Sequence, residues 1–244
     1  MELRSESHRY QCGYWCRRDT ERGESRFPRC GSLNTTTVAG EVIGHSPKPP
    51  IWLERALQGL AFWIGHRHSM FNGYPLSEGA LVAEMCNLIS ANLPSQFVLM
   101  PECFFKNLVS SNKHLQGMAA RARADLVLCD AAAKEIGREG NISTHTKFVI
   151  EVKRNTAAKQ FIDDDLYRLH SLLMAKADGT KCFTVIVSES KSPRRFVKDG
   201  KAKLGSYPIP SCSGTYRVRR VVKAATSFEG KESAHYVCLL EVLL

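Results

Sequence analysis

The chain has 244 residues, of which 43% are hydrophobic and 24% are charged, and its formal net charge is +10. This length suits one large domain better than two, and the composition excludes a fibrous or wholly disordered chain. The sequence has no apolar run near the roughly 20 residues of a membrane helix, and its first residues lack the apolar stretch of a secretory signal. We therefore expect a cytoplasmic protein.

The N-terminal segment, residues 1–48, is rich in Arg, Ser, Thr and Gly and has weak apolar periodicity. We interpret it as a poorly ordered or loosely packed arm. Its residues His8, Cys12, Cys16 and Cys30 could in principle hold zinc, but their spacing lacks the Cys-x-x-Cys pair of structural zinc sites. The odd total of nine cysteines, several of them in apolar stretches, favours reduced, buried thiols over a disulfide framework.

Two helices are predicted after the Pro-rich break at residues 45–50. Residues 51–68 carry apolar side chains at approximately helical spacing. Residues 77–92 begin with Ser77, a residue type that caps helix N-termini well, and their apolar positions also fall on one face. Both segments are therefore expected to pack one side against a core.

The following segments alternate between strand and helix patterns. Three short β-rich runs, at residues 96–105, 123–130 and 147–153, are consistent with a meander. Residues 156–179 have helical periodicity and end in glycine, and the apolar run at residues 182–190 is typical of a strand buried on both faces. The order of strand, helix and strand predicts a right-handed βαβ unit. Two further strand candidates close the chain, at residues 215–224 and 235–244.

The third strand of the meander ends with two opposite charges, in the sequence KFVIEVKR. Because strand side chains alternate between faces, Glu151 and Lys153 are neighbours on one side. Asp125 lies near the start of the preceding strand. An antiparallel pairing of the two strands would therefore bring all three side chains together.

A divalent cation is the expected partner of these carboxylates. Asp125 and Glu151 at one point would repel each other and raise their pKa values unless a cation lay between them. Mg²⁺ prefers carboxylate, carbonyl and water oxygens, and it commonly binds one or two carboxylates together with substrate phosphate. Lys153 could then hold or deprotonate an attacking water, or stabilise the charge that builds up on phosphorus. The simpler alternative is a surface salt bridge between Glu151 and Lys153, which would stabilise little.

Asp125, followed by a Glu-x-Lys element at Glu151 and Lys153, resembles the motif of the PD-(D/E)xK nuclease superfamily over approximately residues 77–200. The resemblance implies an α/β fold with a restriction-endonuclease-like core, in which a central mixed β-sheet is flanked by α-helices. It also implies Asp125 and Glu151 as metal ligands and Lys153 as catalytic base or charge stabiliser. The implied cofactor is Mg²⁺, with Mn²⁺ as a substitute. Ala124 stands where the family motif has proline, although many members lack that proline.

An upstream helix glutamate often joins the site in that family. At about 100° per residue, Glu78 projects near the middle of the apolar face of its helix, whereas Glu84 lies on the flank. A carboxylate that points into a core is costly unless it is paired, but Glu78 also follows the N-cap, where the helix dipole favours an acid. Glu78 is our first candidate for the catalytic set, and Glu84 and Glu102 stay open.

Residues 191–231 hold eleven Lys and Arg against two acids, which is nearly the whole positive excess. Such a region favours polyanions, because contacts to phosphates release counterions, although a solvated basic surface is the alternative. Alternation sets Arg217 and Arg219 on one face, as a candidate DNA-facing ribbon. In the helix before this region, Asp164 or Asp165 is expected to pair with Arg168. Five arginines are predicted to bind DNA: Arg194, Arg195, Arg217, Arg219 and Arg220.

The sequence as a whole predicts a single nuclease domain over residues 49–244, with a basic DNA-binding portion at about residues 190–231. The leading hypothesis is a Mg²⁺-dependent endonuclease that hydrolyses DNA phosphodiester bonds, of restriction or defence type. The alternatives are a non-catalytic nucleic-acid-binding protein on the same scaffold and an RNA-cleaving effector that uses the same site. Restriction enzymes of this fold are often dimers, so a homodimer is also considered.

Overall fold

The computed structural model describes residues 48–71, 76–111, 113, 115, 118–176, 178–189, 191–226 and 233–244. Residues 1–47, which include the candidate zinc residues His8, Cys12, Cys16 and Cys30, lie outside the described residues. The described residues all fall within one structural unit, Ser46–Leu244.

The two helices predicted before the sheet are present, as α1 (Ile51–Phe71) and α2 (Glu78–Asn92). The third predicted helix is α4 (Lys159–Lys176). Two single-turn elements, η1 (Phe105–Leu108) and α3 (Ala133–Ile136), were not predicted, because four residues are too few to show helical periodicity. Among the described residues, no helix combines the length and the apolar character that crossing a bilayer requires.

The six predicted strands are all present among the described residues, and three two-residue strands add to them. The long strands are β1 (Phe97–Phe104), β2 (Arg123–Asp130), β3 (Thr146–Arg154), β4 (Lys181–Ser188), β8 (Thr215–Thr226) and β9 (Ser233–Leu243). The short ones are β5 (Val197–Lys198), β6 (Lys201–Ala202) and β7 (Tyr207–Pro208).

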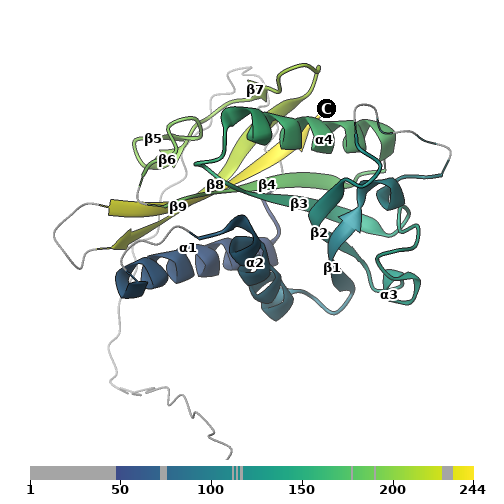
Figure 1. Cartoon of the computed structure of the whole chain (residues 1–244), viewed down its shortest axis with the longest axis horizontal. Helices are drawn as coiled ribbons and strands as arrows, with labels where there is room; N and C mark the ends of the chain where they lie inside the picture. Colours follow the sequence, from purple (N-terminus) through teal and green to yellow (C-terminus); the bar gives the residue numbers. More distant parts are fainter. Residues whose placement is uncertain are drawn as a thin grey trace, which may run out of the picture. The chain divides into compact units, whose positions relative to one another are not determined.

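The seven-stranded sheet runs in the order β1-β2-β3-β4-β9-β8-β7, and β5 pairs with β6 in a separate hairpin. The first three strands form the predicted meander, whereas β3 and β4 are parallel and are joined by α4 as the predicted βαβ unit. Strand β9 pairs antiparallel with both β4 and β8. In Figure 1, α4 lies on one face of this mixed sheet, and α1 and α2 lie on the other. The prediction of an α/β fold with helices flanking a mixed sheet is confirmed.

Alternation along β3 sends its side chains into two separate cores. Val149 packs in the core beneath α4, and Ile150 and Val152 pack in the core beneath α1 and α2. Glu151 and Lys153 share the alternation of Val149, so they leave the strand on the side of α4. The charged end of β3 is thus directed to the inner surface of the helix that follows it.

The start of α2 is fixed by the predicted cap. Ser77 precedes the helix, and its Oγ accepts a hydrogen bond from the backbone N–H of Ala80 at 3.2 Å. A serine cap of this kind typically contributes about 1 kcal/mol to helix stability. Glu78 is therefore the first residue of α2, where the helix dipole also favours its negative charge.

All six described cysteines are free thiols, as the sequence predicted. Burial raises the pKa of Cys103 and of Cys238 to about 12, and that of Cys129 to about 11. Thiols with such high pKa values are neutral and weakly reactive at physiological pH. These cysteines therefore pack in the cores as small apolar side chains.

Candidate active site

Antiparallel pairing of β2 with β3 brings Asp125 beside Glu151. The ladder pairs Leu126 with Ile150. Asp125, the residue before Leu126, is therefore a neighbour of Glu151, the residue after Ile150. Oδ2 of Asp125 accepts a hydrogen bond from the backbone N–H of Val152 at 2.7 Å. The Asp125 and Glu151 side chains are also close enough for each to shift the pKa of the other. Two acidic side chains from different strands therefore meet where the ladder ends.

Glu151 is almost fully buried, with only 1% of its surface exposed. Its Oε1 has no hydrogen-bond partner among the described residues. Burial raises the pKa of Glu151 well above its usual range, the charge of Asp125 raises it further, and the guanidinium of Arg168 opposes both. Burial also raises the pKa of Asp125, against the hydrogen bond from Val152. Two carboxyl groups in this setting share a proton unless a cation neutralises them.

The ammonium group of Lys153 lies between two further carboxylates. Its Nζ is 2.5 Å from Oε1 of Glu78, at the start of α2, and 3.3 Å from Oδ2 of Asp165, in α4. The Lys153 side chain is only 15% exposed, so both ion pairs form in surroundings where charge attraction is stronger than at an open surface. Helices on opposite faces of the sheet thus hold the lysine in place.

Asp165 joins Lys153 to a second cation. Its side chain is 1% exposed, and its Oδ1 accepts a hydrogen bond from Nη2 of Arg168 one turn later in α4. The predicted pairing of Asp165 with Arg168 is confirmed, and Asp164 instead accepts from Gln160. The contact of Asp165 with Lys153 was not predicted from the sequence. The feature of the sequence that could have indicated this contact is an acidic residue, Asp165, at a core-facing position of the helix beside the apolar Leu166.

The three upstream glutamates occupy different settings. Glu78 reaches the site through Lys153, whereas Glu84 is half-buried further along the same helix. Glu102 is exposed in β1, and its charge acts together with that of Asp125 to raise the pKa of the Cys86 thiol, after the larger effect of burial. The φ of Glu102 is 56°, in the left-handed region that non-glycine residues seldom adopt. Glu78 is the upstream glutamate in direct contact with the proposed catalytic lysine.

The residues present fit a divalent cation bound by few protein ligands. Within the described residues, no group of three or more His, Cys, Asp or Glu side chains is arranged to hold a metal ion. Mg²⁺ usually keeps several water ligands and binds through one or two carboxylates plus a substrate phosphate. The Asp125–Glu151 pair, with the unpartnered Oε1 of Glu151, is a donor set of that type.

Two of the five arginines that were predicted to bind DNA take part in internal ion pairs. Arg195 pairs with Asp163 of α4, and Nε of Arg219 lies 2.8 Å from Oε2 of Glu241 in β9. The Arg219 and Glu241 side chains are 12% and 9% exposed. These two guanidinium groups are therefore partly or largely occupied within the protein.

The other three nominated arginines are more accessible. Nε of Arg217 donates to Oγ of Ser206 at 3.1 Å in an exposed contact, and Arg194 and Arg220 are exposed. A β-bulge between Val218 and Arg220 interrupts the pairing of β8 with β9, which the alternation pattern did not predict. The DNA-binding role of the five arginines stays a prediction.

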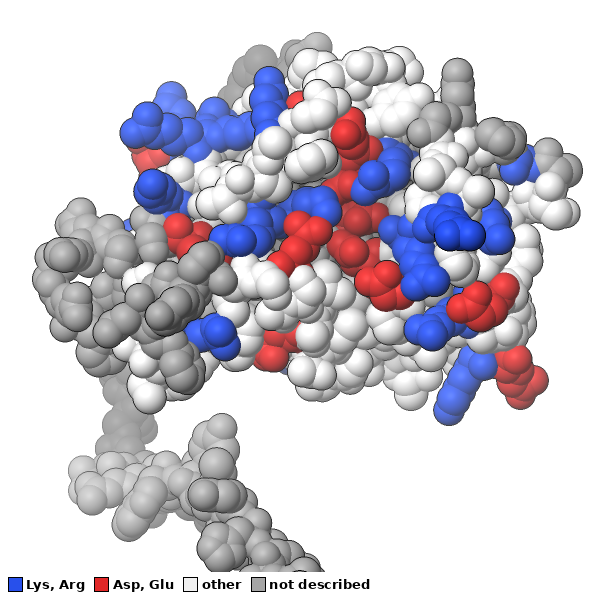
Figure 2. Space-filling view, viewed as in Figure 1, with Lys and Arg blue, Asp and Glu red and all other residues white. Residues whose placement is uncertain are grey.

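Charges of opposite sign are segregated on the face that carries this site. In Figure 2, acidic side chains gather in the middle of the face, between α4 and the helices α1 and α2 of Figure 1. Lys and Arg side chains lie on both sides of this acidic centre. The face therefore carries an acidic centre that is flanked by two basic areas.

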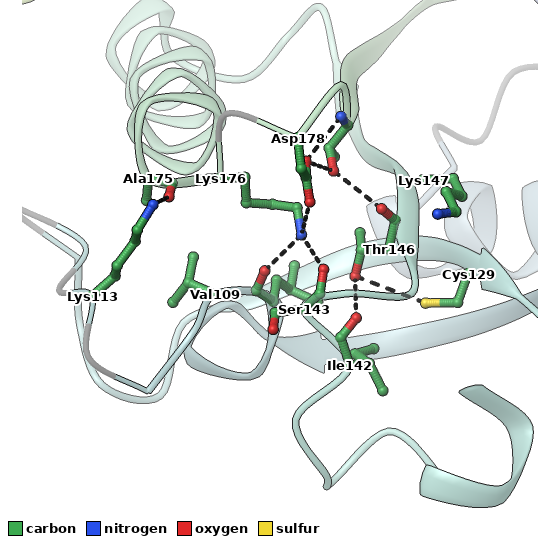
Figure 3. Close-up of polar contacts among 12 residues, drawn as sticks. Val109, Lys113, Cys129, Ile142, Ser143, Thr146, Lys147, Ala175, Lys176 and Asp178 are labelled. Atoms are coloured by element: carbon green, nitrogen blue, oxygen red, sulfur yellow. Dashed lines mark hydrogen bonds and ion pairs between the residues drawn. The ribbon is translucent and has the colours of Figure 1, made fainter. Parts of the chain in front are cut away.

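The helix that carries Asp165 is anchored at its other end by a buried lysine (Figure 3). Nζ of Lys176 donates to the backbone oxygens of Leu108 and Ser143, and it lies 3.1 Å from Oδ2 of Asp178. Only 2% of the Lys176 side chain is exposed. Because one carbonyl group belongs to η1 and the other to the loop before β3, these contacts resist sliding of α4 along the sheet.

No family model, no curated protein and no solved structure matches this chain. What the site can do chemically is therefore inferred from the groups that it contains. These are two adjacent carboxyl groups with raised pKa values, an unpartnered buried oxygen, and two cations within the same network.

Proposed function

We propose that this protein is a metal-dependent endonuclease that hydrolyses phosphodiester bonds in DNA. The observation that carries the proposal is the meeting of Asp125 and Glu151, with Oε1 of Glu151 buried and unpartnered among the described residues. An unsatisfied buried acceptor costs about 1–3 kcal/mol, and more when it is charged. A cation bound between the two carboxyl groups would satisfy this oxygen.

In this proposal Asp125 and Glu151 would hold a Mg²⁺ ion, a cation that usually binds one or two protein carboxylates together with a substrate phosphate. When bound, the ion lowers the pKa of a water ligand and polarises the phosphoryl group. The two carboxylates also fix where the scissile phosphate lies, because they approach from adjacent strands at the end of one ladder. Water attacks phosphorus and loses a proton to the surrounding solvent, the bond from phosphorus to the leaving oxygen breaks, and that oxygen takes up a proton from the solvent.

Lys153 is assigned to charge stabilisation rather than to proton abstraction. Its Nζ donates a hydrogen bond to Oε1 of Glu78 and forms an ion pair with Oδ2 of Asp165, as a charged ammonium group does. An ammonium group has three N–H donors, so one stays available for a phosphoryl oxygen. Arg168 adds a second positive charge to the same network through Asp165. Fixed cations of this kind stabilise the charge that develops on phosphorus in the transition state.

DNA is the proposed substrate because the Asp125, Glu151 and Lys153 pattern resembles that of restriction-type nucleases. Destruction of foreign DNA is the role that this resemblance suggests, by analogy of fold and motif. An RNA-cleaving effector would use the same residues and would differ in its substrate preference. A non-catalytic binding protein would bind nucleic acid without a divalent ion and would tolerate loss of Asp125.

The proposal is tested by incubating the purified full chain with supercoiled plasmid DNA and, separately, with RNA in Mg²⁺, Ca²⁺ or chelator. We expect nicked or linear plasmid with Mg²⁺ and intact plasmid with chelator, and little cleavage of RNA. Asp125→Asn should be inactive, whereas Asp130→Asn, at the other end of β2, should cleave normally. Chelator-resistant cleavage, or equal cleavage by Asp125→Asn and the unmodified chain, would contradict the proposal.

A further inference from the structure

The hairpin of β5 and β6 is built to present lysines at a tight turn. Asp199 and Gly200 both have positive φ, 50° and 73°, which is the backbone of a two-residue type I′ turn. The ladder sets Lys198 directly opposite Lys201, and both residues are exposed. Like charges directly opposite each other destabilise a strand pair. The pair of lysines therefore destabilises the hairpin locally, while it places two ammonium groups side by side at the surface.

The surroundings of the turn extend this positive surface. Residues 191–204 contain six Lys and Arg against a single Asp. In Figure 2, Lys and Arg side chains gather over the region where Figure 1 places β5 and β6. Lys198, Lys201 and Lys203 line a surface hollow of about 680 Å³. Leu204 lines the same hollow and is 91% exposed, an unusual setting for a large apolar side chain in a charged area.

The segment that leads into the hairpin is fixed to the helix that supports the candidate active site. Arg195 pairs with Asp163 of α4, and its Nε donates to the hydroxyl of Tyr216 at 3.3 Å. Its guanidinium also lies over the rings of Phe196 and Tyr216, 5.2 Å and 5.6 Å from their centroids. Asp165, two residues after Asp163, contacts Lys153. The basic hairpin and the proposed catalytic lysine are thus attached to one turn of α4.

We infer that the β5–β6 hairpin is the surface with which this protein holds duplex DNA, and this inference rests on the proposed function. Lys198, Lys201 and Lys203 contact phosphates of the strands that flank the cleaved bond. Leu204 enters the minor groove beside them, where single apolar side chains can wedge between base steps. One exposed leucine is too small an apolar area to bind a lipid surface. The hairpin also shares the face of Figure 2 with the acidic centre, as a substrate-binding surface must.

The test measures binding of a short DNA duplex by fluorescence anisotropy, with the full chain in Ca²⁺, over about 50 to 200 mM salt. The test variant carries Lys198→Gln, Lys201→Gln and Lys203→Gln. We expect a loss of affinity of about tenfold or more at about 100 mM salt, and a log–log salt slope smaller by about 2 to 3. The charge-matched control carries Lys134→Gln, Arg138→Gln and Lys147→Gln, three exposed cations around α3 and the start of β3. Its affinity should stay within about twofold of the unmodified chain.

The wedge has its own measurement. A duplex with 2-aminopurine at successive positions should gain fluorescence when the unmodified chain binds, because the wedge unstacks one base step. Leu204→Ala should bind without that gain, and its melting curve should be unchanged, since the side chain is exposed. Equal gains with both proteins would overturn the wedge.

The two levels of the proposal fail in different ways. If the chain cleaves plasmid DNA but the three-lysine variant binds with the same affinity and salt slope as the unmodified chain, the hairpin inference is wrong and the nuclease stands. If the hairpin lysines govern duplex binding but no divalent ion supports cleavage, the nuclease is wrong. Binding to vesicles of anionic lipid without binding to the duplex would overturn the choice of partner.

Discussion

Nζ of Lys153 lies 2.5 Å from Oε1 of Glu78, although 75 residues separate the two in the chain. One residue lies near the end of β3 and the other begins α2, so the contact joins the motif strand to a helix that precedes the sheet. Among the three upstream glutamates that the sequence left open, the contact distinguishes Glu78 from Glu84 and Glu102.

The first prediction concerns Glu78→Gln. Loss of the carboxylate charge should lower the single-turnover cleavage rate roughly 10- to 100-fold, because small displacements of a charge-stabilising group are costly in the transition state. The affinity for DNA should change by less than about threefold. Glu84→Gln, on the same helix, is the matched control and should cleave normally. A slow Glu84→Gln with a normal Glu78→Gln would show that the wrong glutamate has been assigned.

The second prediction concerns Asp165→Asn. Removing a charge that is 1% exposed weakens the hold on both Lys153 and Arg168, so the free energy of unfolding should fall by about 2 to 3 kcal/mol. The cleavage rate should fall as well, since the lysine is then held from α2 alone. Chemical denaturation and single-turnover kinetics give the two readouts. Asp164→Asn removes the same charge from the neighbouring residue, whose partner is Gln160, and should cost less than about 1 kcal/mol. Equal effects of the two variants would contradict the special position of Asp165.

Much of the fold could be predicted from the sequence, because its periodicities are regular. The alternation in KFVIEVKR and the apolar run of β4 predicted the βαβ unit, and Ser77 predicted the start of α2. The short β5, β6 and β7 strands escaped prediction because two residues show no alternation. The bulge in β8 escaped for another reason, since it depends on pairing with β9 and not on the local sequence.

The candidate site could be predicted only in part. The convergence of Asp125 and Glu151 follows from strand pairing, which local patterns indicate well. The contact of Lys153 with Asp165 depends on how α4 packs over the sheet, and neither spacing nor composition reports that geometry. Arg195 shows the same difficulty. From its sequence it was expected to be free to bind DNA, whereas in the fold it forms an ion pair with Asp163.

The third prediction concerns pH. Burial, then the charge of Asp125, raises the pKa of Glu151 above its unfolded value of 4.5, so the charged form is disfavoured in the folded protein. Stability from this group is therefore complete below that unfolded value and is lost as the pH rises through the raised folded value. Glu151→Gln has no titrating carboxyl group at this position, so its stability does not fall with pH for this reason. Without divalent ions, its free energy of unfolding should exceed that of the unmodified chain by more at about pH 8 than at about pH 5.

Thermal unfolding with and without divalent ions completes this third prediction. Mg²⁺ or Mn²⁺ should raise the melting temperature of the unmodified chain at about pH 8 and leave that of Glu151→Gln unchanged. Glu139→Gln, an exposed glutamate near α3, is the control and should respond to the ion as the unmodified chain does. If the free energy of unfolding of the unmodified chain, relative to that of Glu151→Gln, rises with pH, the prediction is wrong.

The fourth prediction tests the anchor at the end of α4. Lys176→Met removes a buried ammonium group from two carbonyl oxygens and from Asp178, and should lower the free energy of unfolding by about 2 to 3 kcal/mol. This loss is smaller than that expected for a fully buried ion pair, because the Asp178 side chain is 39% exposed. Lys113→Met is the control, since Lys113 donates to the oxygen of Ala175 from the surface, and it should cost less than about 1 kcal/mol. Similar losses in the two variants would show that Lys176 is not an anchor.

The fifth prediction addresses Lys153, whose ammonium group is proposed to stabilise charge beside the two proposed metal ligands. The most direct test is single-turnover cleavage of labelled DNA in Mg²⁺ by the unmodified chain and by Lys153→Ala, with DNA affinity measured in Ca²⁺. We predict that Lys153→Ala binds DNA within about threefold of the unmodified chain and that its cleavage rate falls by about 10²-fold or more. Cleavage by Lys153→Ala at the rate of the unmodified chain would contradict the account.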